Sequence, residues 1–200
     1  MNKLITLVCC CWLILLSASA RAQLQGVELD NPELIPSFTL SEKDGSLFTA
    51  QDLKDSWTLL MFGFNSCPDV CPFTLHNLEA ALAETALRVR PDDLPRVVFI
   101  SVDPERDRET VSDYARFFHP DFRGVTGEQE QIDVLVNATD SFYRYMPADS
   151  SGYYEVQHSS AVSVVGPDGM VRAKLQPPFH AGKTAEFLAR LQIAYRRGDG

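Results

Sequence analysis

The amino-acid sequence predicts one α/β domain built on a mixed sheet. Trp57–Phe64 and Val97–Val102 are almost entirely apolar, as expected of strands buried on both faces of a sheet. A segment with helical spacing separates them, which favours a parallel pair joined by a crossover helix. Two later strand-like runs, Ala161–Val165 and Met170–Leu175, flank the turn Pro167-Asp168-Gly169 and favour an antiparallel hairpin.

The first 22 residues have the features of a secretory signal peptide. Lys3 supplies a positive charge, Leu4–Leu16 is apolar, and Ala20-Arg21-Ala22 offers a cleavage pattern. The apolar stretch is shorter than the roughly 17–25 residues that a membrane span requires. We therefore expect cleavage, with an uncleaved N-terminal anchor as the alternative, and a protein that is exported to the periplasm or anchored facing it.

The elements that follow are taken in order along the chain. Residues 23–35 are polar and are expected to form a tether, so that the folded domain spans 36–197. Phe38–Leu40 and Leu47–Phe48 flank the turn dipeptide Asp44-Gly45, which predicts an N-terminal β-hairpin. Apolar residues at helical spacing predict helices over 72–88, 107–118, 128–146 and 184–196. A further strand is expected at 153–157.

This order is the thioredoxin-like plan, with an added N-terminal hairpin and a helical insertion before the last hairpin. In such sheets, ligand sites gather at the carboxyl ends of parallel strands. Cys67 and Cys71 follow the first parallel strand directly. The predicted fold therefore places this cysteine pair where a ligand site is expected.

The charge balance narrows the class of partner. The chain has 18 basic and 27 acidic residues, a formal net charge of −9. Nucleic acids and anionic lipids both require a basic face, so neither is expected as a partner. Membrane association is expected only through an uncleaved N-terminus. The acidic surplus would suit a basic protein partner, or it keeps the domain soluble.

Once Cys9–Cys11 are lost with the signal segment, Cys67 and Cys71 are the cysteines that remain. A disulfide across so short a loop removes little chain entropy, so stabilisation is a poor reason for the pair. Two thiolates at a strand-to-helix turn can instead bind a soft metal or form a redox-active disulfide. If Cys71 lies in the first helical turn, the helix dipole is expected to favour its thiolate.

A metal held by two thiolates needs at least a third ligand, for which an imidazole is suitable. His158, placed by the pattern on the loop of the closing hairpin, is the leading candidate, and His180 follows. His76 is expected on the surface, and His119 at a helix end. Two thiolates with one imidazole suit Cu(I), or Cu(II) with one more oxygen or nitrogen donor, whereas a structural zinc site would need a fourth protein ligand. We expect one copper ion per chain.

Four separated motifs resemble those of the SCO/SenC family, and the likeness covers about 36–194: Cys67–Pro72, Phe99–Asp107, Gly124–Gly127 and Val156–Ser159. The resemblance implies a copper protein that assists maturation of the binuclear copper site of cytochrome c oxidase. It implies copper ligation by Cys67, Cys71 and His158, the set favoured above. The implied partners are the copper-bearing oxidase subunit or another copper chaperone. Gln157 stands where family members often carry an acidic residue.

The resemblance also implies that Asp103 lies near the metal site, outside the ligands themselves; capping of the following turn is the alternative. We expect a metallochaperone rather than an enzyme, with thiol–disulfide exchange as an auxiliary activity. One alternative function is a thiol–disulfide reductase that keeps a partner's metal-binding cysteines reduced and does not need His158. Another is a peroxide-reducing enzyme, which would need a cation such as Arg106 or Arg108 to lower the pKa of its cysteine.

Overall fold

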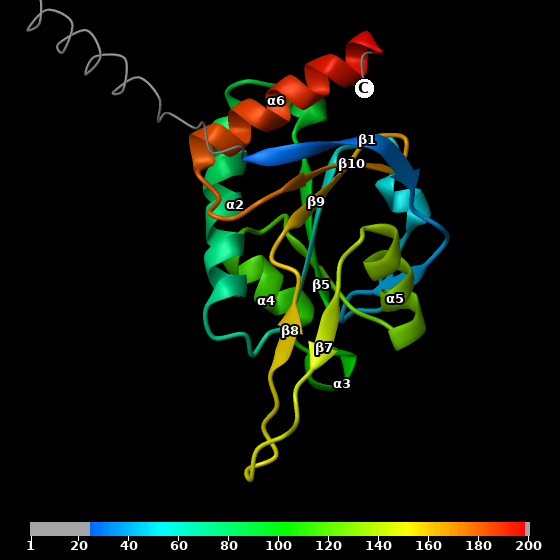
Figure 1. The fold of residues 1–200 in the computed structure, drawn as a ribbon, viewed down its shortest axis with the longest axis vertical. Coiled ribbons are helices and arrows are strands. Elements are labelled where there is room, and N and C mark those ends of the chain that lie inside the picture. The colour runs from blue at the N-terminus through cyan, green and yellow to red at the C-terminus, as the bar shows by residue number, and fades with distance from the viewer. Residues whose placement is uncertain (1–24, 199–200) are drawn as a thin grey trace, which may run out of the picture.

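The computed structural model describes residues 25–198 and shows a six-stranded sheet in the order β1-β10-β9-β4-β5-β6 (Figure 1). The predicted signal segment lies outside the described residues. The strands are β1 Gly26–Leu34, β2 Thr39–Ser41, β3 Leu47–Thr49, β4 Thr58–Gly63, β5 Arg96–Ser101, β6 Arg123–Val125, β7 Tyr143–Tyr145, β8 Val156–His158, β9 Val162–Val165 and β10 Met170–Leu175. The α-helices are α2 Val70–Ala86, α3 Pro104–Asp107, α4 Val111–Phe118, α5 Gln129–Ala138 and α6 Ala181–Arg197, and the 3-10 helices are η1 Ala50–Leu53 and η2 Pro91–Asp93.

The centre of the sheet confirms the predicted mixed arrangement. Strands β4 and β5 are parallel, β9 is antiparallel to β4, and β9 and β10 form the predicted antiparallel hairpin. The short strand β6 adds a third parallel strand beside β5. It packs so closely on α4 that a Cβ at Gly124 would lie 2.0 Å from the carbonyl oxygen of Val111. The N-terminal hairpin is also confirmed, as the separate sheet β2–β3.

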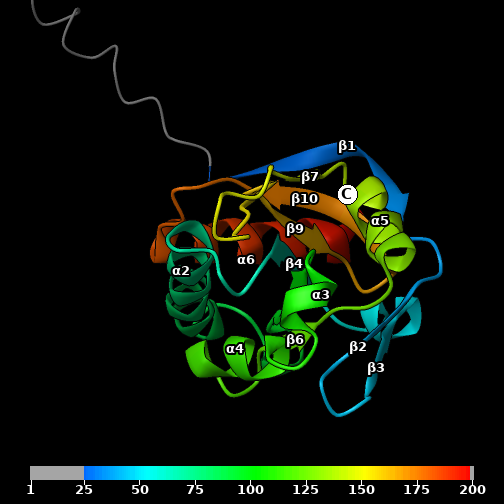
Figure 2. The same cartoon turned by 90° about the horizontal axis from the view of Figure 1, so that it is seen from below.

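Both faces of the sheet are covered, which explains the continuous apolar runs in its central strands. In β4, Leu59 and Met61 belong to the core shared with α2, α4 and α6, whereas Leu60 and Phe62 belong to the core shared with β2, β3 and α5. Figure 2 shows α2 and α4 on one side and α5 with the β2–β3 hairpin on the other. Alternate side chains of one strand thus fill two separate cores.

The prediction of a tether over 23–35 is wrong, because Gly26–Leu34 forms strand β1 and pairs antiparallel with β10. The folded unit therefore begins well before residue 36. Gln25 secures its start, since its side-chain amide donates hydrogen bonds to the carbonyl oxygens of Gln176 and Pro178, at 2.8 and 3.0 Å. Strand β1 is an edge strand with mostly exposed side chains, so it lacks the apolar pattern of a central strand.

The helix predicted over 128–146 is wrong in its second half, because α5 ends at Ala138. Asp140 takes a left-handed conformation with φ of 43°, which stops the helix. Tyr143–Tyr145 then forms β7, which pairs with β8, and the connection between them projects from the domain as a long hairpin (Figure 1). His158 consequently lies at the end of strand β8, and not on a loop between two strands at 153–157 and 161–165, where the sequence pattern places it. None of the described helices is long and apolar enough to span a membrane.

Candidate metal centre

The two cysteines lie at the carboxyl end of β4, as predicted. The amide of Cys67 donates to the carbonyl oxygen of Phe64 at 3.1 Å, and this turn leads into α2, whose first turn contains Cys71. Cys71 is completely buried and Cys67 is half-buried. A Cβ at Gly63 would lie 2.6 Å from both the Cys71 sulfur and the Phe99 ring, so a residue without a side chain leaves room for this sulfur.

His158 reaches the cysteines from strand β8. Its neighbour Ser159 is fastened to Phe142 by two hydrogen bonds, from the Ser159 amide to the Phe142 carbonyl oxygen at 3.0 Å and from the Phe142 amide to Ser159 Oγ at 2.9 Å. His158 Nδ1 lies 2.9 Å from the carbonyl oxygen of Ser159, which can only accept, so Nδ1 carries the proton. This tautomer leaves the lone pair on Nε2, which lies 3.4 Å from Cys71 Sγ. The Phe64 ring packs edge-on against the imidazole.

The donor atoms of Cys67, Cys71 and His158 all lie within 4.8 Å of one another. Sulfur and nitrogen ligands bound at about 2.3 and 2.0 Å to one ion are themselves roughly 3.5–4 Å apart. The donors therefore need only a small movement to share one ion. Over residues 25–198, this is the one group of three or more metal-ligating side chains that comes so close together. Its two sulfurs and one imidazole nitrogen are a donor set suited to copper.

The two sulfurs differ in acidity, in the sense opposite to the sequence prediction. Hydrogen bonding from the Cys71 side chain, with help from His158 and the Cys71 amide, holds the pKa of Cys67 far below its usual range. The interaction with Cys67, together with burial, raises the pKa of Cys71. The Cys71 amide donates to Cys67 Sγ at 3.4 Å. The N–H groups at the start of α2 thus act on the cysteine before the helix, and Cys67 is the thiolate.

The other histidines lie away from this cluster. His76 is exposed on α2, as predicted. His119 follows the end of α4, also as predicted, and its Nδ1 accepts a hydrogen bond from the Asp121 amide at 3.2 Å. His180 precedes α6, where it is exposed and where its amide donates to the Gln25 side chain at 2.9 Å. Only His158 of the four joins the cysteines.

Asp103 is fully buried at the carboxyl end of β5, and its carboxylate turns toward the projecting hairpin. It accepts a hydrogen bond from the Tyr154 hydroxyl at 3.0 Å and forms an ion pair with Arg106. Arg106 in turn donates to the Tyr154 carbonyl oxygen at 3.0 Å, and its guanidinium lies 3.9 Å from the centre of the Tyr154 ring. We call these three residues the hairpin clamp. It holds the chain two residues before β8, the strand that carries His158.

Asp107, rather than Asp103, acts electrostatically on the cysteines. Its carboxylate accepts hydrogen bonds from the Asn65 amide at 2.8 Å and from Ser101 Oγ at 2.5 Å, and so ties the turn after β4 to β5. Burial raises the pKa of Asp107, and its charge contributes to raising the pKa of Cys71. Sequence reasoning missed this role, although Asp107 closes the motif Phe99–Asp107 that contains Asp103.

A groove of about 500 Å³ opens beside the cluster and makes it accessible. Cys67 and His158 line it, and the partly exposed apolar side chains of Val70 and Phe142 stand at its sides. Asp69 and Glu155 add carboxylates to its lining. A second protein can therefore approach the exposed sulfur and the imidazole directly, while the Cys71 sulfur stays buried behind them.

Three comparisons place the chain among known proteins. The family model SCO1/SenC matches residues 27–192. The chain is 33% identical over 171 residues to the human "Protein SCO1 homolog, mitochondrial", with 84% of this chain and 56% of that protein covered. It is 32% identical over 152 residues to a "Putative copper-binding protein" of Stutzerimonas stutzeri, with 75% and 72% covered. The chain thus spans little more than half the length of the human relative.

Solved structures agree with these matches. The structure resembles Arabidopsis thaliana ScoI, solved with copper bound, with a TM-score of 0.72 and 30% identity over 81% of this chain and 99% of that one. It resembles apo Sco1 from Thermus thermophilus with a TM-score of 0.71 and 32% identity over 88% and 99%. These neighbours confirm the predicted thioredoxin-like architecture with its additional elements.

Proposed function

Because the chain belongs to the SCO1/SenC family, we propose that it is a copper metallochaperone that assists maturation of the binuclear copper site of cytochrome c oxidase. The observation that carries the proposal is the convergence of two sulfurs and one imidazole nitrogen within 4.8 Å. The similar Arabidopsis protein, solved with copper bound, supports the choice of ion. One copper ion, as Cu(I) or Cu(II), is the cargo of each chain.

The acidity of the two sulfurs suggests how the site loads. Cys67 is already a thiolate and stands at the groove, so it is the first ligand that an incoming ion meets. Cys71 holds its proton before the ion binds and must release it on binding. His158 offers its Nε2 lone pair without losing a proton, because Nδ1 carries it. Because Cys67 and His158 line the groove, a partner's ligands could reach a copper ion held by the three residues and replace these residues one at a time.

A thiol–disulfide reductase remains the second candidate, and the asymmetry of the cysteines favours it. A half-buried thiolate beside a buried, protonated thiol is the arrangement of an attacking and a resolving cysteine. Cys67 would attack one sulfur of a partner's disulfide and release the other as a thiolate. Cys71 would then lose its proton and attack the Cys67 sulfur of this mixed disulfide, which releases the partner's second sulfur as a thiolate. The partner is left with two thiols and this chain with a Cys67–Cys71 disulfide. Neither cysteine forms a disulfide in the structure, so the pair has the reduced form that this reaction starts from.

We propose the copper-bearing oxidase subunit or another copper chaperone as the partner, and the periplasm as the place of action. The oxidase role is supported by family membership, and the location by the apolar stretch Leu4–Leu16 with its cleavage pattern. Asp103 is proposed as a positioning residue, which acts on the metal centre through the hairpin clamp and not by touching a ligand.

The full chain, reduced and loaded with one equivalent of Cu(I), tests the copper proposal by stoichiometry and affinity. His158→Ala is expected to weaken copper binding strongly, whereas the exposed His76→Ala is the matched control and should bind as the unaltered chain does. Cys67→Ser is expected to abolish binding of one ion per chain. Retention of full affinity by His158→Ala would contradict the assigned ligand set. Reductase activity that is unaffected by His158→Ala would support thiol exchange as a separate function.

A further inference from the structure

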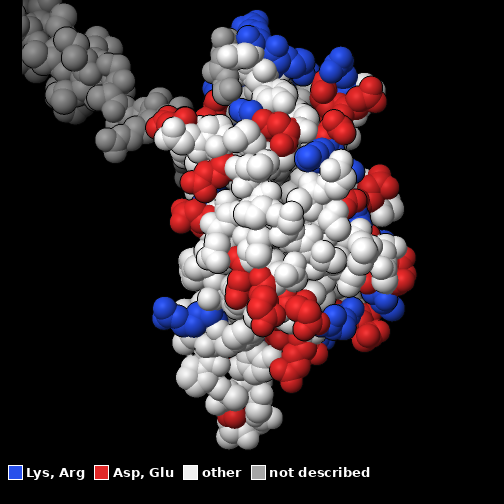
Figure 3. Space-filling view, turned by 90° about the vertical axis from the view of Figure 1, so that its right-hand side faces the viewer, with Lys and Arg blue, Asp and Glu red and all other residues white. Residues whose placement is uncertain are grey.

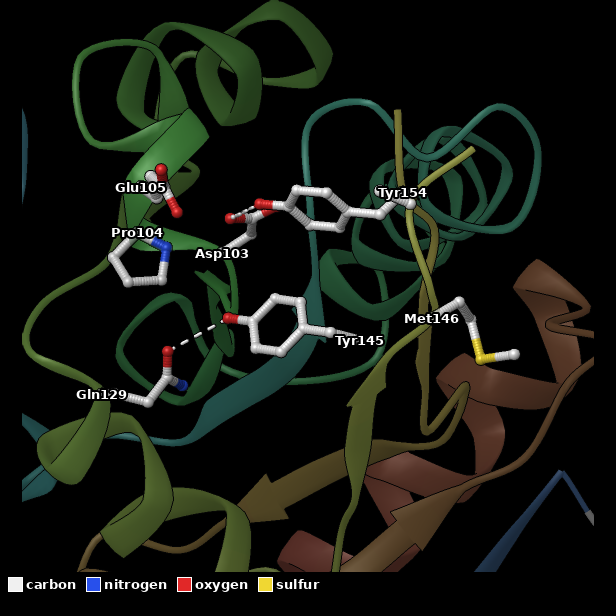
Figure 4. A pocket seen from close by; sticks show the side chains of 8 residues that line it. Asp103, Pro104, Glu105, Gln129, Tyr145, Met146 and Tyr154 are labelled. Carbon is white, nitrogen blue, oxygen red and sulfur yellow. Dashed lines mark hydrogen bonds between the residues drawn. The ribbon is translucent and has the colours of Figure 1, made fainter. Parts of the chain in front are cut away.

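A second cavity, of about 440 Å³, lies between the projecting hairpin and helix α3 and shares no lining residue with the groove beside Cys67 (Figure 4). Tyr145 and Tyr154 contribute aromatic rings, Met146 a thioether, and Pro104 and Glu105 face them from α3. The volume falls in the range of about 300–1,000 Å³ that is common for binding pockets. The proposed copper chemistry uses none of these five side chains as a ligand.

The aromatic walls of this cavity are fixed in place by their hydroxyl groups. The Tyr145 hydroxyl donates its proton to the carbonyl oxygen of Val102 at 2.5 Å, and Oε1 of Gln129 lies 3.0 Å from the same hydroxyl oxygen. The Tyr154 hydroxyl donates to Asp103, and the two rings meet edge to face at 5.7 Å. Because the rings are already ordered, a ligand would lose little affinity to the cost of immobilising them.

The charge of the cavity is negative. Asp103 and Glu105 are its charged lining residues, and no lysine or arginine lines it. Arg106 pairs with Asp103 from behind the cavity and balances that carboxylate. Glu105 is exposed on the rim and forms no ion pair with any residue of the described part of the chain. Acidic side chains gather on this side of the molecule, above the largely uncharged tip of the hairpin (Figure 3).

We propose that this cavity binds an arginine side chain of a partner protein. A guanidinium group can lie on a tyrosine ring and at the same time pair with a carboxylate through two parallel hydrogen bonds, which an ammonium group cannot do. Glu105 provides the carboxylate and Tyr145 the ring for the guanidinium, because Arg106 already covers a face of the Tyr154 ring. Tyr154, Pro104 and Met146 provide surface for the aliphatic stem. The identity of the partner as one that exchanges copper depends on the proposed function, whereas the binding itself does not involve copper.

The test uses the full chain, reduced and metal-free, labelled with ¹⁵N and titrated with a blocked glycine–arginine–glycine peptide. Amide signals of Glu105, Tyr145 and Tyr154 are expected to shift together, with a dissociation constant in the millimolar range. The same peptide with citrulline, which has the shape of arginine without the charge, should bind at least about threefold more weakly. Equal binding of the two peptides, or shifts that map elsewhere, would overturn the proposal.

Two substitutions distinguish specific binding of the arginine peptide in the cavity from a general attraction of the peptide to the acidic surface. Glu105→Gln is expected to lower the affinity for the arginine peptide about two- to fivefold, which corresponds to the contribution of an exposed ion pair. Glu109→Gln removes another exposed charge, in the connection between α3 and α4 and near Lys43, and should leave the dissociation constant unchanged. An equal effect of the two substitutions would refute the site. If the chain binds copper but not the peptide, the proposed arginine site is wrong and the copper function stands. If the chain binds the peptide but not copper, only the proposed copper function is wrong.

Discussion

The hairpin clamp offers the sharpest test of how the fold supports the metal centre. Arg106→Met removes the charge that balances Asp103 and the hydrogen bond to the Tyr154 carbonyl oxygen. Methionine keeps most of the aliphatic length, so the side chain can still pack against the rings of Tyr154 and Phe64 that Arg106 covers. The substitution therefore isolates the polar contacts from the packing.

The size of the effect on stability follows from burial. Breaking a buried ion pair by removing one partner costs about 3–5 kcal/mol, because the other charge is left uncompensated. The Asp103 side chain is 1% exposed, but that of Arg106 is 23% exposed, and Asp103 keeps its hydrogen bond from Tyr154. We therefore expect a loss of about 2–4 kcal/mol in the free energy of unfolding, within the roughly 5–15 kcal/mol available to a domain. The variant should fold.

The effect on copper follows from the position of the clamp two residues before β8. A looser Tyr154 lets the strand that carries His158 move away from the cysteines. Groups that orient metal ligands typically contribute 10- to 100-fold to affinity, and we expect about a tenfold loss for Arg106→Met. Copper affinity by competition with a chelator, and unfolding by urea, measure the two effects on the same samples. Arg108→Met is the matched control, since Arg108 is exposed and pairs with Glu128 on the surface.

A double-mutant cycle with His158→Ala decides whether the clamp acts through this ligand. If it does, Arg106→Met causes no further loss of copper affinity once His158 is absent, while its effect on stability stays the same. A tenfold loss in both backgrounds would refute the reasoning, because the clamp would then act on the cysteines. A loss of stability without any change in copper affinity would reduce the clamp to a purely structural role.

Two further predictions concern the sulfurs and the packing behind them. In the reduced, metal-free chain, iodoacetamide should label Cys67 at a nearly constant rate from neutral pH down to about pH 5. The labelling of an ordinary thiol instead slows about tenfold per pH unit below its pKa near 8.5. Cys71 should stay unlabelled, and equal labelling of both cysteines in a mass spectrum would contradict the assignment of Cys67 as the thiolate. Gly124→Ala should cost about 1–3 kcal/mol or more in urea unfolding, because its Cβ would lie 2.0 Å from the Val111 carbonyl oxygen. Gly182→Ala on α6, with nothing within 4 Å, should instead be neutral or stabilising by up to about 1 kcal/mol.

The parts of the fold that the sequence predicts well are those with strong local patterns. Trp57–Phe64 is apolar throughout because β4 faces two cores, and this pattern cannot be mistaken for a loop. Strand β1 carries no such pattern, since as an edge strand it leaves most side chains exposed, and it depends on backbone pairing with β10, which is distant in the sequence. The helix expected over 128–146 ran too far because Phe142 and Met146 continue the helical spacing by coincidence, while the turn at Asp140 has no apolar signal.

The candidate site shows the same division. The three converging residues could be named from chemistry and motif, because two sulfurs at a strand end require a third donor and few histidines are available. The environment of these residues could not be predicted from the sequence, because it depends on pairing between segments that are distant along the chain. His158 was expected on the loop of the closing hairpin, yet it pairs with Tyr143, thirteen residues before β8 begins. Helix-dipole reasoning favoured Cys71, yet the amide at the start of α2 points to Cys67.

The β7–β8 hairpin explains why one small element serves both the metal centre and the second cavity. Its base presents His158 to the cysteines, and farther out it presents Tyr145 and Tyr154 to helix α3. Tyr154 belongs to the hairpin clamp and also lines the cavity, so an arginine bound there would contact the residue that holds the ligand strand. Contact of the arginine with Tyr154 would then favour the conformation in which His158 lies at the sulfurs. By linkage, copper bound to His158 would strengthen the binding of the arginine in the cavity. A partner's arginine should accordingly bind the copper-loaded chain more tightly than the His158→Ala variant, and equal affinity for both would show that the two sites are independent.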